Sequence, residues 1–149
     1  MKDTGKNLRE TIIDVKARLL NINEENACIK LNPDSWSKKE ILGHLIDSAT
    51  NNHQRFVRAI LNIAGEYPTY NQNNWVETQK YNGTNWYDLI ELFYFYNLHL
   101  SRVIESIPDT ALNNSCNIGK EKPVTLEFIA KDYVRHLKHH IEKILEPIV

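Results

Sequence analysis

Glycine and proline are scarce in this chain, with five of each among 149 residues, and they fall between long stretches of helical periodicity. This scarcity argues against a flexible linker and favours an all-α fold. A chain of this length is typical of one domain built around a single hydrophobic core. We therefore predict a single domain that spans residues 1–149.

Cysteine and net charge are also low. Cys28 and Cys116 stand far apart and form no C-x-x-C motif, which argues against a disulfide framework and against a thiolate zinc site. A net charge of −1 offers no basic face of the kind that nucleic-acid-binding proteins carry, so we expect no nucleic-acid partner. No run of 18 apolar residues occurs, and the first ten residues lack the apolar segment of a signal peptide. We expect a cytoplasmic protein without a membrane partner.

Four long segments do show the three- and four-residue spacing of apolar residues that is typical of amphipathic helices. The predicted helices, including one short helix, lie at about residues 6–21, 38–64, 74–80, 86–107 and 125–146. Ser37 and Glu40 form the S-x-x-E capping box, which sets the start of the second long helix. Residues 65–85 are too many for a simple turn. The sequence predicts a four-helix bundle with two short connections and one longer crossover.

Three of the six histidines fall in RHLKHH, residues 135–140. Each residue of an α-helix turns about 100°, so His136 and His140 lie about 40° apart and one turn apart along the axis. Two imidazoles at this spacing can share a metal ion. The same angles place both rings beside the apolar stripe and turn His139 outward. Exposed or core-edge histidines are the alternative, since two ligands alone make a weak site.

The helical angles do not identify a third ligand. His44 belongs to a polar strip on the second long helix, in which Ser48, Asn51 and Arg55 follow at steps of four, three and four residues. The strip lies about 150° from the middle of that helix's apolar stripe. Periodicity alone therefore favours a solvated face over a polar cleft. Of the other histidines, His53 falls on the apolar side of the same helix.

Two segments, WSKKEILGHLIDSATNNHQRF at residues 36–56 and HLKHHIEKI at residues 136–144, resemble the DinB-like family of small four-helix metal-binding proteins. The resemblance extends over nearly the whole chain in the order and spacing of the helices, although only these two segments are specific. It implies a metal site with three ligands, His44, His136 and His140. It further implies a pocket beside the metal that is lined by Ser48, Asn51 and Arg55.

Three neutral imidazoles would leave a divalent ion its full charge and open positions, so the ion could lower the pKa of a water or a thiol and polarise an electrophile. All-histidine ligation suits zinc, nickel or iron. The resemblance thus implies a small-molecule substrate and either a metal-dependent hydrolase or a transferase that uses a low-molecular-weight thiol. A non-catalytic bundle that binds metal, or that forms a homodimer through an apolar face, is the alternative.

Two side chains on the second long helix are candidates for a catalytic role. Asp47 is a candidate to orient a ligand or to act as a base, and the alternative is a solvated acid on the helix surface. Arg55 could hold an anionic group of the substrate, because its planar guanidinium matches a carboxylate. Its alternative is a salt bridge on the exterior of the bundle. The sequence does not identify the general base.

Overall fold

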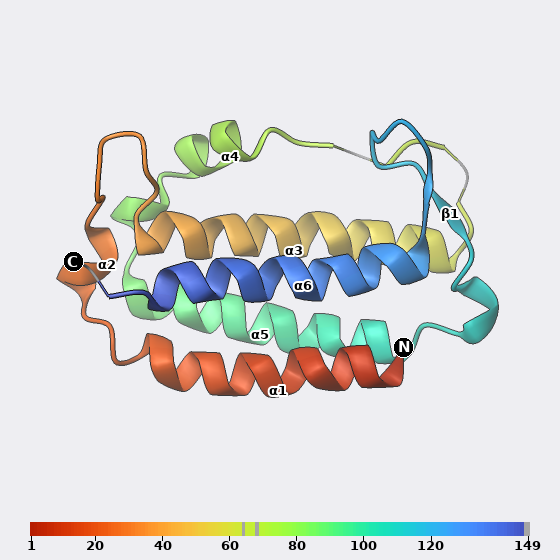
Figure 1. Cartoon of the computed structure of the whole chain (residues 1–149), viewed down its shortest axis with the longest axis horizontal. Coiled ribbons are helices and arrows are strands. Elements are labelled where there is room, and N and C mark those ends of the chain that lie inside the picture. The colour runs from red at the N-terminus through yellow and green to blue at the C-terminus, as the bar shows by residue number, and fades with distance from the viewer. Residues whose placement is uncertain (64, 68, 148–149) are drawn as a thin grey trace.

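The computed structural model describes residues 1–63, 65–67 and 69–147. Its long helices are α1 (Lys2–Leu19), α3 (Lys38–Ile60), α5 (Trp86–Glu105) and α6 (Leu126–Leu145) (Figure 1). The shorter elements are α2 (Glu24–Cys28), α4 (Gln72–Gln79), the 3-10 turns η1 (Tyr81–Gly83) and η2 (Asp109–Ala111), and the strands β1 (Ser115–Cys116) and β2 (Val124–Thr125). The predicted four-helix bundle is confirmed, and the two strands add a small antiparallel hairpin.

The boundaries of the helices differ from the prediction by a few residues. The second long helix was predicted to continue to Ala64, which lies outside the described residues. In the structure this helix ends at Ile60, and Asn62 takes a φ of 52°, a left-handed conformation that a continuing right-handed helix excludes. Helix α2 and the hairpin were not predicted, because elements this short carry no readable periodicity.

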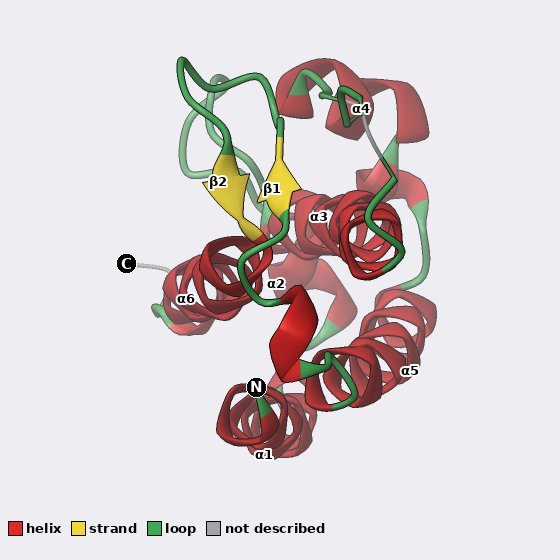
Figure 2. Cartoon of the chain, turned by 90° about the vertical axis from the view of Figure 1, so that its right-hand side faces the viewer, coloured by secondary structure: helices red, strands yellow, loops and turns green. Residues whose placement is uncertain are grey.

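The four long helices form a ring in which α1 packs against α5 and α6, and α3 packs against the same two helices (Figure 2). Helices α3 and α5 run in one direction and α1 and α6 in the other (Figure 1). Because α3 and α5 are parallel neighbours, the connection between them has to return along the bundle. It carries α4 and η1, and both lie against α3. The crossover therefore covers the outer side of α3.

The start of α3 is fixed by the predicted capping box. The Ser37 hydroxyl accepts a hydrogen bond from the Glu40 amide at 3.2 Å, and the Glu40 carboxylate accepts one from the Ser37 amide at 2.8 Å. The Ser37 hydroxyl also donates to the Asn82 side chain at 2.7 Å, which joins this helix end to η1. These contacts set the rotation of α3, and hence the direction in which its polar strip points.

The core of the bundle is formed by apolar side chains from all four long helices, including Leu8, Phe56, Phe93 and Leu137, which have no exposed surface. Their burial follows the predicted stripes of apolar residues. No described helix combines the length and the apolar character that crossing a bilayer would require.

Candidate metal centre

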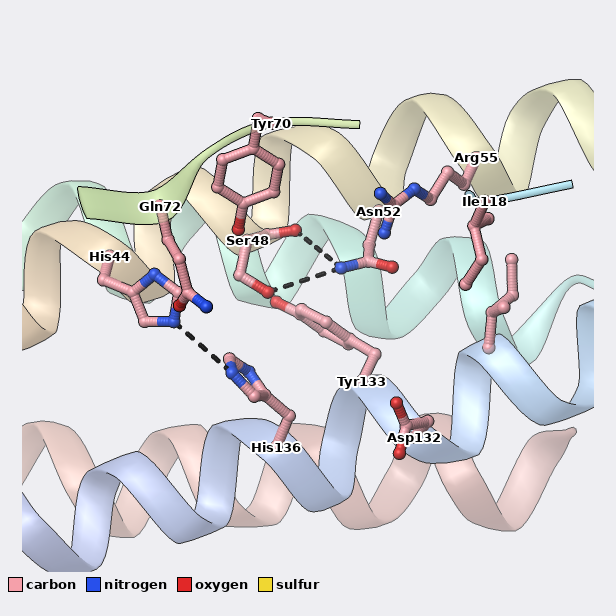
Figure 3. A pocket seen from close by; sticks show the side chains of 11 residues that line it. His44, Ser48, Asn52, Arg55, Tyr70, Gln72, Ile118, Asp132, Tyr133 and His136 are labelled. Atoms are coloured by element: carbon pink, nitrogen blue, oxygen red, sulfur yellow. Dashed lines mark hydrogen bonds between the residues drawn. The ribbon is translucent and has the colours of Figure 1, made fainter. Parts of the chain in front are cut away.

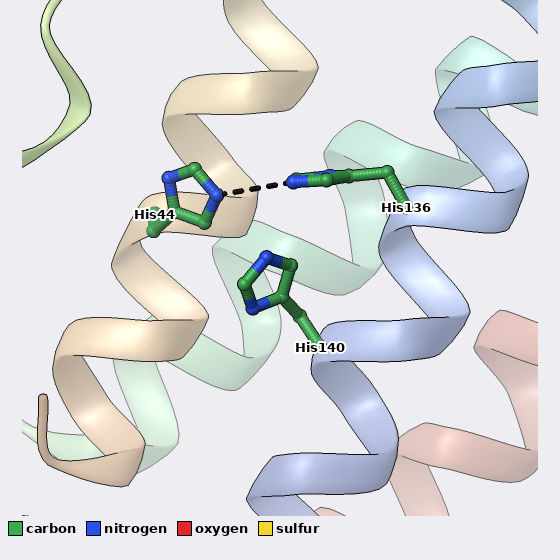
Figure 4. A group of neighbouring side chains, drawn as sticks. All are labelled: His44, His136 and His140. Carbon is green, nitrogen blue, oxygen red and sulfur yellow. Dashed lines mark hydrogen bonds between the residues drawn. The ribbon is translucent and has the colours of Figure 1, made fainter.

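Three histidine rings meet between α3 and α6 (Figure 4). His44 projects from α3, while His136 and His140 project from successive turns of α6. The Nε2 atoms of His44 and His136 lie 3.3 Å apart. The centroid of the His140 ring lies 4.9 Å from the centroid of the His44 ring and 4.5 Å from that of the His136 ring. One nitrogen from each ring lies within 4.8 Å of the other two, so the structure brings together the three residues predicted as ligands.

The geometry of this cluster fits a divalent ion. Zinc–nitrogen bonds of about 2.0–2.1 Å at tetrahedral angles place neighbouring ligand nitrogens about 3.3 Å apart. The separation between His44 and His136 has this value already. A ring nitrogen of His140 lies within 4.8 Å of the ligand atoms of His44 and His136, and rotation of the His140 side chain would bring the three nitrogens to this spacing. Three histidines also leave coordination positions open for water or a substrate.

Burial sets the protonation state of the cluster. His44 is only 1% exposed, and desolvation, assisted by the two neighbouring rings, lowers the pKa of His44 to about 3. Desolvation and the neighbouring His136 lower the pKa of His140 to about 4, and desolvation also lowers the pKa of His136. All three rings are therefore neutral near pH 7, which is the form in which imidazole binds a metal.

The hydrogen bonding of the three rings is incomplete. The buried Nδ1 atoms of His44 and His140 have no hydrogen-bond partner among the described residues. Where one nitrogen of each ring faces the other two rings, one N–H and one lone pair can form a single hydrogen bond, and the third nitrogen stays without a partner. A divalent cation would instead accept one lone pair from each of the three nitrogens. The His139 ring is exposed, as the helical angles predict.

A cavity of about 190 Å³ extends from His44 and His136 along the groove between α3 and α6 (Figure 3). Its walls come from α3, from α6, from the crossover and from the loop after β1. The residues that line it are His44, Ser48, Asn52, Arg55, Tyr70, Gln72, Ile118, Ile129, Asp132, Tyr133 and His136. The cavity thus joins the histidine cluster to a mostly polar wall.

The polar strip of α3 is buried at His44 and Ser48 and half-buried at Asn51 and Arg55, whereas periodicity alone favoured a solvated face. Ser48 is 4% exposed, and Ser48 and Arg55 both line the cavity. The crossover and α6 cover this side of α3, so polar side chains point into the protein. A helical pattern cannot reveal such a cover, because it records only which residues share a face.

Asn51 does not line the cavity, and its neighbour Asn52 does. The Asn51 amide folds back and donates to the backbone carbonyl of Asp47 at 2.9 Å. The Asn52 amide donates to the Ser48 carbonyl at 2.8 Å and reaches the Ser48 hydroxyl at 3.3 Å. Residues three and four positions after Ser48 both lie next to it on the helix surface, on either side of a line parallel to the axis. The spacing alone therefore did not decide which of the two asparagines lines the cavity.

Asp47 is buried, at 2% exposure, and does not line the cavity. Its Oδ1 accepts hydrogen bonds from the Tyr81 hydroxyl and from the Gln79 side-chain amide, both at 2.6 Å. Burial raises the pKa of Asp47. Gly43 makes room for this contact, since a Cβ there would lie 2.1 Å from the Tyr81 ring. Through these two hydrogen bonds, Asp47 holds the crossover against α3 near His44.

The sequence did not indicate the residues of the cavity wall that lie outside the long helices, which are Tyr70, Gln72 and Ile118. Tyr70 and Gln72 belong to the crossover, where Gln72 begins α4, and Ile118 belongs to the loop after β1. None of them sits in a periodic pattern next to a histidine. The length of the crossover was the only available signal, because long connections often shape sites.

Comparisons with known proteins give one family and several similar structures. The sequence profile of the DinB superfamily matches residues 7–144. No curated protein sequence matches the chain. Among solved structures, YfiT from Bacillus subtilis, described as a probable metal-dependent hydrolase with an unusual four-helix bundle topology, superposes with a TM-score of 0.85 at 20% identity. The superposition covers 96% of this chain and 83% of YfiT.

A mycothiol-dependent maleylpyruvate isomerase superposes with a TM-score of 0.76 at 14% identity. Here 95% of this chain is covered but only 59% of the isomerase, so this chain corresponds to a little over half of that protein. At such low identities both similarities show the fold alone.

Proposed function

Because the chain belongs to the DinB superfamily and shares its fold with YfiT, we propose that it is a metal-dependent enzyme acting on a small molecule. The ligands in this proposal are His44, His136 and His140. One observation carries it: three neutral imidazoles converge at the end of a polar cavity. The family match also confirms the resemblance seen in the two histidine-bearing segments.

A bound zinc, nickel or iron ion would lower the pKa of a water or thiol and polarise an electrophile. The protein's contribution is to hold three ligands with their lone pairs exposed to one point and to exclude bulk water around His44. The neutral state of the rings supports this, since no proton has to leave before an ion binds.

Arg55 has the chemistry to select the substrate. Figure 3 shows its guanidinium turned along the cavity toward Asn52. Desolvation lowers the pKa of Arg55, yet a guanidinium keeps its charge at pH 7. A planar cation in the partly dehydrated wall of a cavity that Ser48 and Tyr70 also line suits a carboxylate or a similar anion. We propose that the substrate carries such a group.

Hydrolysis is the first candidate reaction, supported by the similarity to YfiT, a probable metal-dependent hydrolase. Transfer of a low-molecular-weight thiol to an electrophile is the second candidate, supported by the similarity to a mycothiol-dependent isomerase. Both use the same three ligands, and they differ in whether water or a thiol attacks the substrate.

Metal content tests the ligand set. Protein purified without a histidine tag should hold about one ion per chain. His44→Ala should remove it, because two ligands make a weak site, while His139→Ala should retain it as the matched control. Equal losses in both variants, or no metal in the parent protein, would refute the proposed ligands.

Activity separates the two reactions. The metal-loaded protein is incubated with anionic esters and amides, and in parallel with anionic electrophiles plus a panel of small thiols. Turnover without thiol supports the hydrolase, and turnover that requires a thiol supports the transferase. Arg55→Gln should raise KM for the anionic substrate while the metal content is unchanged. No turnover in any arm would leave the non-catalytic metal-binding bundle as the better account.

A further inference from the structure

A second pair of histidines lies on the opposite side of α3, where α3 packs against α5. His53 is nine residues after His44, which places it about 180° around the helix axis. Its ring is 5.0 Å from that of His99 on α5, measured between centroids, with an angle of 74° between the ring planes. The proposed function uses neither residue.

The arrangement of this pair matches the rings of the metal centre. In that cluster, the three pairs of rings have centroid separations of 4.5, 4.9 and 5.2 Å and interplanar angles of 63°, 68° and 76°. The values for His53 and His99 fall inside both ranges. Two imidazoles placed in this way can turn a nitrogen each toward one ion.

Tyr96 holds the His53 ring in place. The tyrosine hydroxyl lies 2.9 Å from Nδ1 of His53, and it shares a face of α5 with His99 three residues later. When Nδ1–H donates to the tyrosine oxygen, the lone pair of Nε2 remains available to a metal. Ligating histidines usually have such a partner on their other nitrogen, since it fixes the tautomer and the orientation of the ring.

The pair is open to solvent, because His99 is exposed and His53 is half-buried. An ion could therefore reach it without any change in the bundle, and water would complete its coordination. With two protein ligands instead of three, its affinity should be lower than that of the metal centre.

We propose that His53 and His99 form a second site for a divalent ion of the imidazole-preferring kind, such as copper, nickel or zinc. Copper(II) is the most sensitive probe, because it forms the strongest complexes in this series. The ion would join α3 directly to α5 and stabilise the bundle by binding only to the folded form. This inference is independent of the proposed function.

Copper titration by calorimetry tests the site. The parent protein should bind two equivalents, the second more weakly, and His99→Asn should bind only one. His139→Asn, which also removes an exposed histidine, is the matched control and should keep both. A single equivalent in the parent protein would overturn the proposal. So would a second equivalent that survives in both His99→Asn and His53→Gln.

Two further measurements locate the ion. In His44→Ala, which lacks the metal centre, copper should still broaden the ring-proton resonances of His99 in the NMR spectrum; unaffected resonances would overturn the site. Tyr96→Phe keeps both ligands and should weaken the second equivalent about tenfold, as loss of a supporting hydrogen bond typically does. Unchanged affinity in this variant would refute the role given to the tyrosine.

Discussion

The α1–α5 interface and the α3–α6 interface of this bundle are built from different side chains. The buried residues of α1 are Gly5, Leu8, Ile12, Val15 and Leu19, all without a polar side chain. At Gly5 the helices are so close that a Cβ would lie 2.4 Å from Glu105. Between α3 and α6, by contrast, the protein encloses a cavity and a cluster of histidines.

The two interfaces contribute differently to the free energy of folding. Hydrocarbon packing stabilises a fold by about 25 cal/mol per Å² of buried apolar surface, whereas a buried polar atom without a partner costs about 1–3 kcal/mol. His44 carries such an atom. The α1–α5 half thus supports the fold, and the α3–α6 half carries the groups that the proposed function uses.

The largest effect on folding should come from the hydrocarbon interface. Ile12 is fully buried, so Ile12→Ala should lower the free energy of unfolding by about 2–5 kcal/mol through lost contacts and a cavity. The metal content of the folded protein should be unchanged. Urea denaturation measures the first quantity. Ile13→Ala is the matched control, since Ile13 is 54% exposed, and equal effects in both variants would contradict this account.

A metal ion bound between α3 and α6 should stabilise the folded protein. Zinc at one hundred times the dissociation constant of the three-histidine site should raise the free energy of unfolding by about 2.7 kcal/mol, and a chelator should reverse the gain. Thermal and urea unfolding with and without zinc measure it. We expect most of this gain to be lost in His44→Ala, where only the weaker pair of His53 and His99 remains, and a full gain in His139→Ala. Equal stabilisation of both variants would place the ion elsewhere.

A smaller effect is expected where the crossover meets α3. Gly43→Ala would push the Tyr81 ring away and disturb its hydrogen bond to Asp47. Overpacking of this kind costs about 1–3 kcal/mol, partly offset by the gain of about 1 kcal/mol in helix propensity. Urea denaturation again gives the value. Gly83→Ala, at a position with no atom close to the added methyl group, should have little effect, and a larger loss there would argue against the clash.

The smallest effect should come from the charged rim of the hydrocarbon interface. Arg9 and Glu105 form an ion pair at 2.7 Å with both side chains partly exposed. Glu105→Gln should therefore cost less than about 1 kcal/mol, and the cost should shrink at high salt. A loss in the free energy of unfolding that is large and independent of salt would contradict this account, because it would mean that the ion pair, and not only the apolar packing, stabilises the α1–α5 interface.

Local rules were sufficient to predict most of the fold. Apolar periodicity located the four long helices, and the capping box at Ser37 gave the start of α3. The fixed turn angle of a helix also separated the exposed His139 from the half-buried His136 and His140. These features depend on neighbours in the sequence, which is why one sequence is enough to predict them.

Features that depend on distant segments were not accessible in the same way. The burial of His44 results from α6 and the crossover lying over α3, and only the family resemblance indicated this residue as a ligand. Asn52 lines the cavity in place of Asn51 because of the rotation of α3 about its own axis, which depends on the segments that pack against this helix. Tyr70 and Ile118 reach the cavity through connections that no periodic rule describes.

The parallel course of α3 and α5 has a consequence for how this protein can change. The groups proposed to bind the ion are fixed in long helices, whereas Tyr70 and Gln72, which line the cavity, belong to the crossover between α3 and α5. We therefore expect that exchanging the segment that contains these two residues would change which molecules the cavity admits and leave the three histidines in place. Such a replacement should end before Tyr81, because the hydrogen bond from Tyr81 to Asp47 holds the crossover against α3.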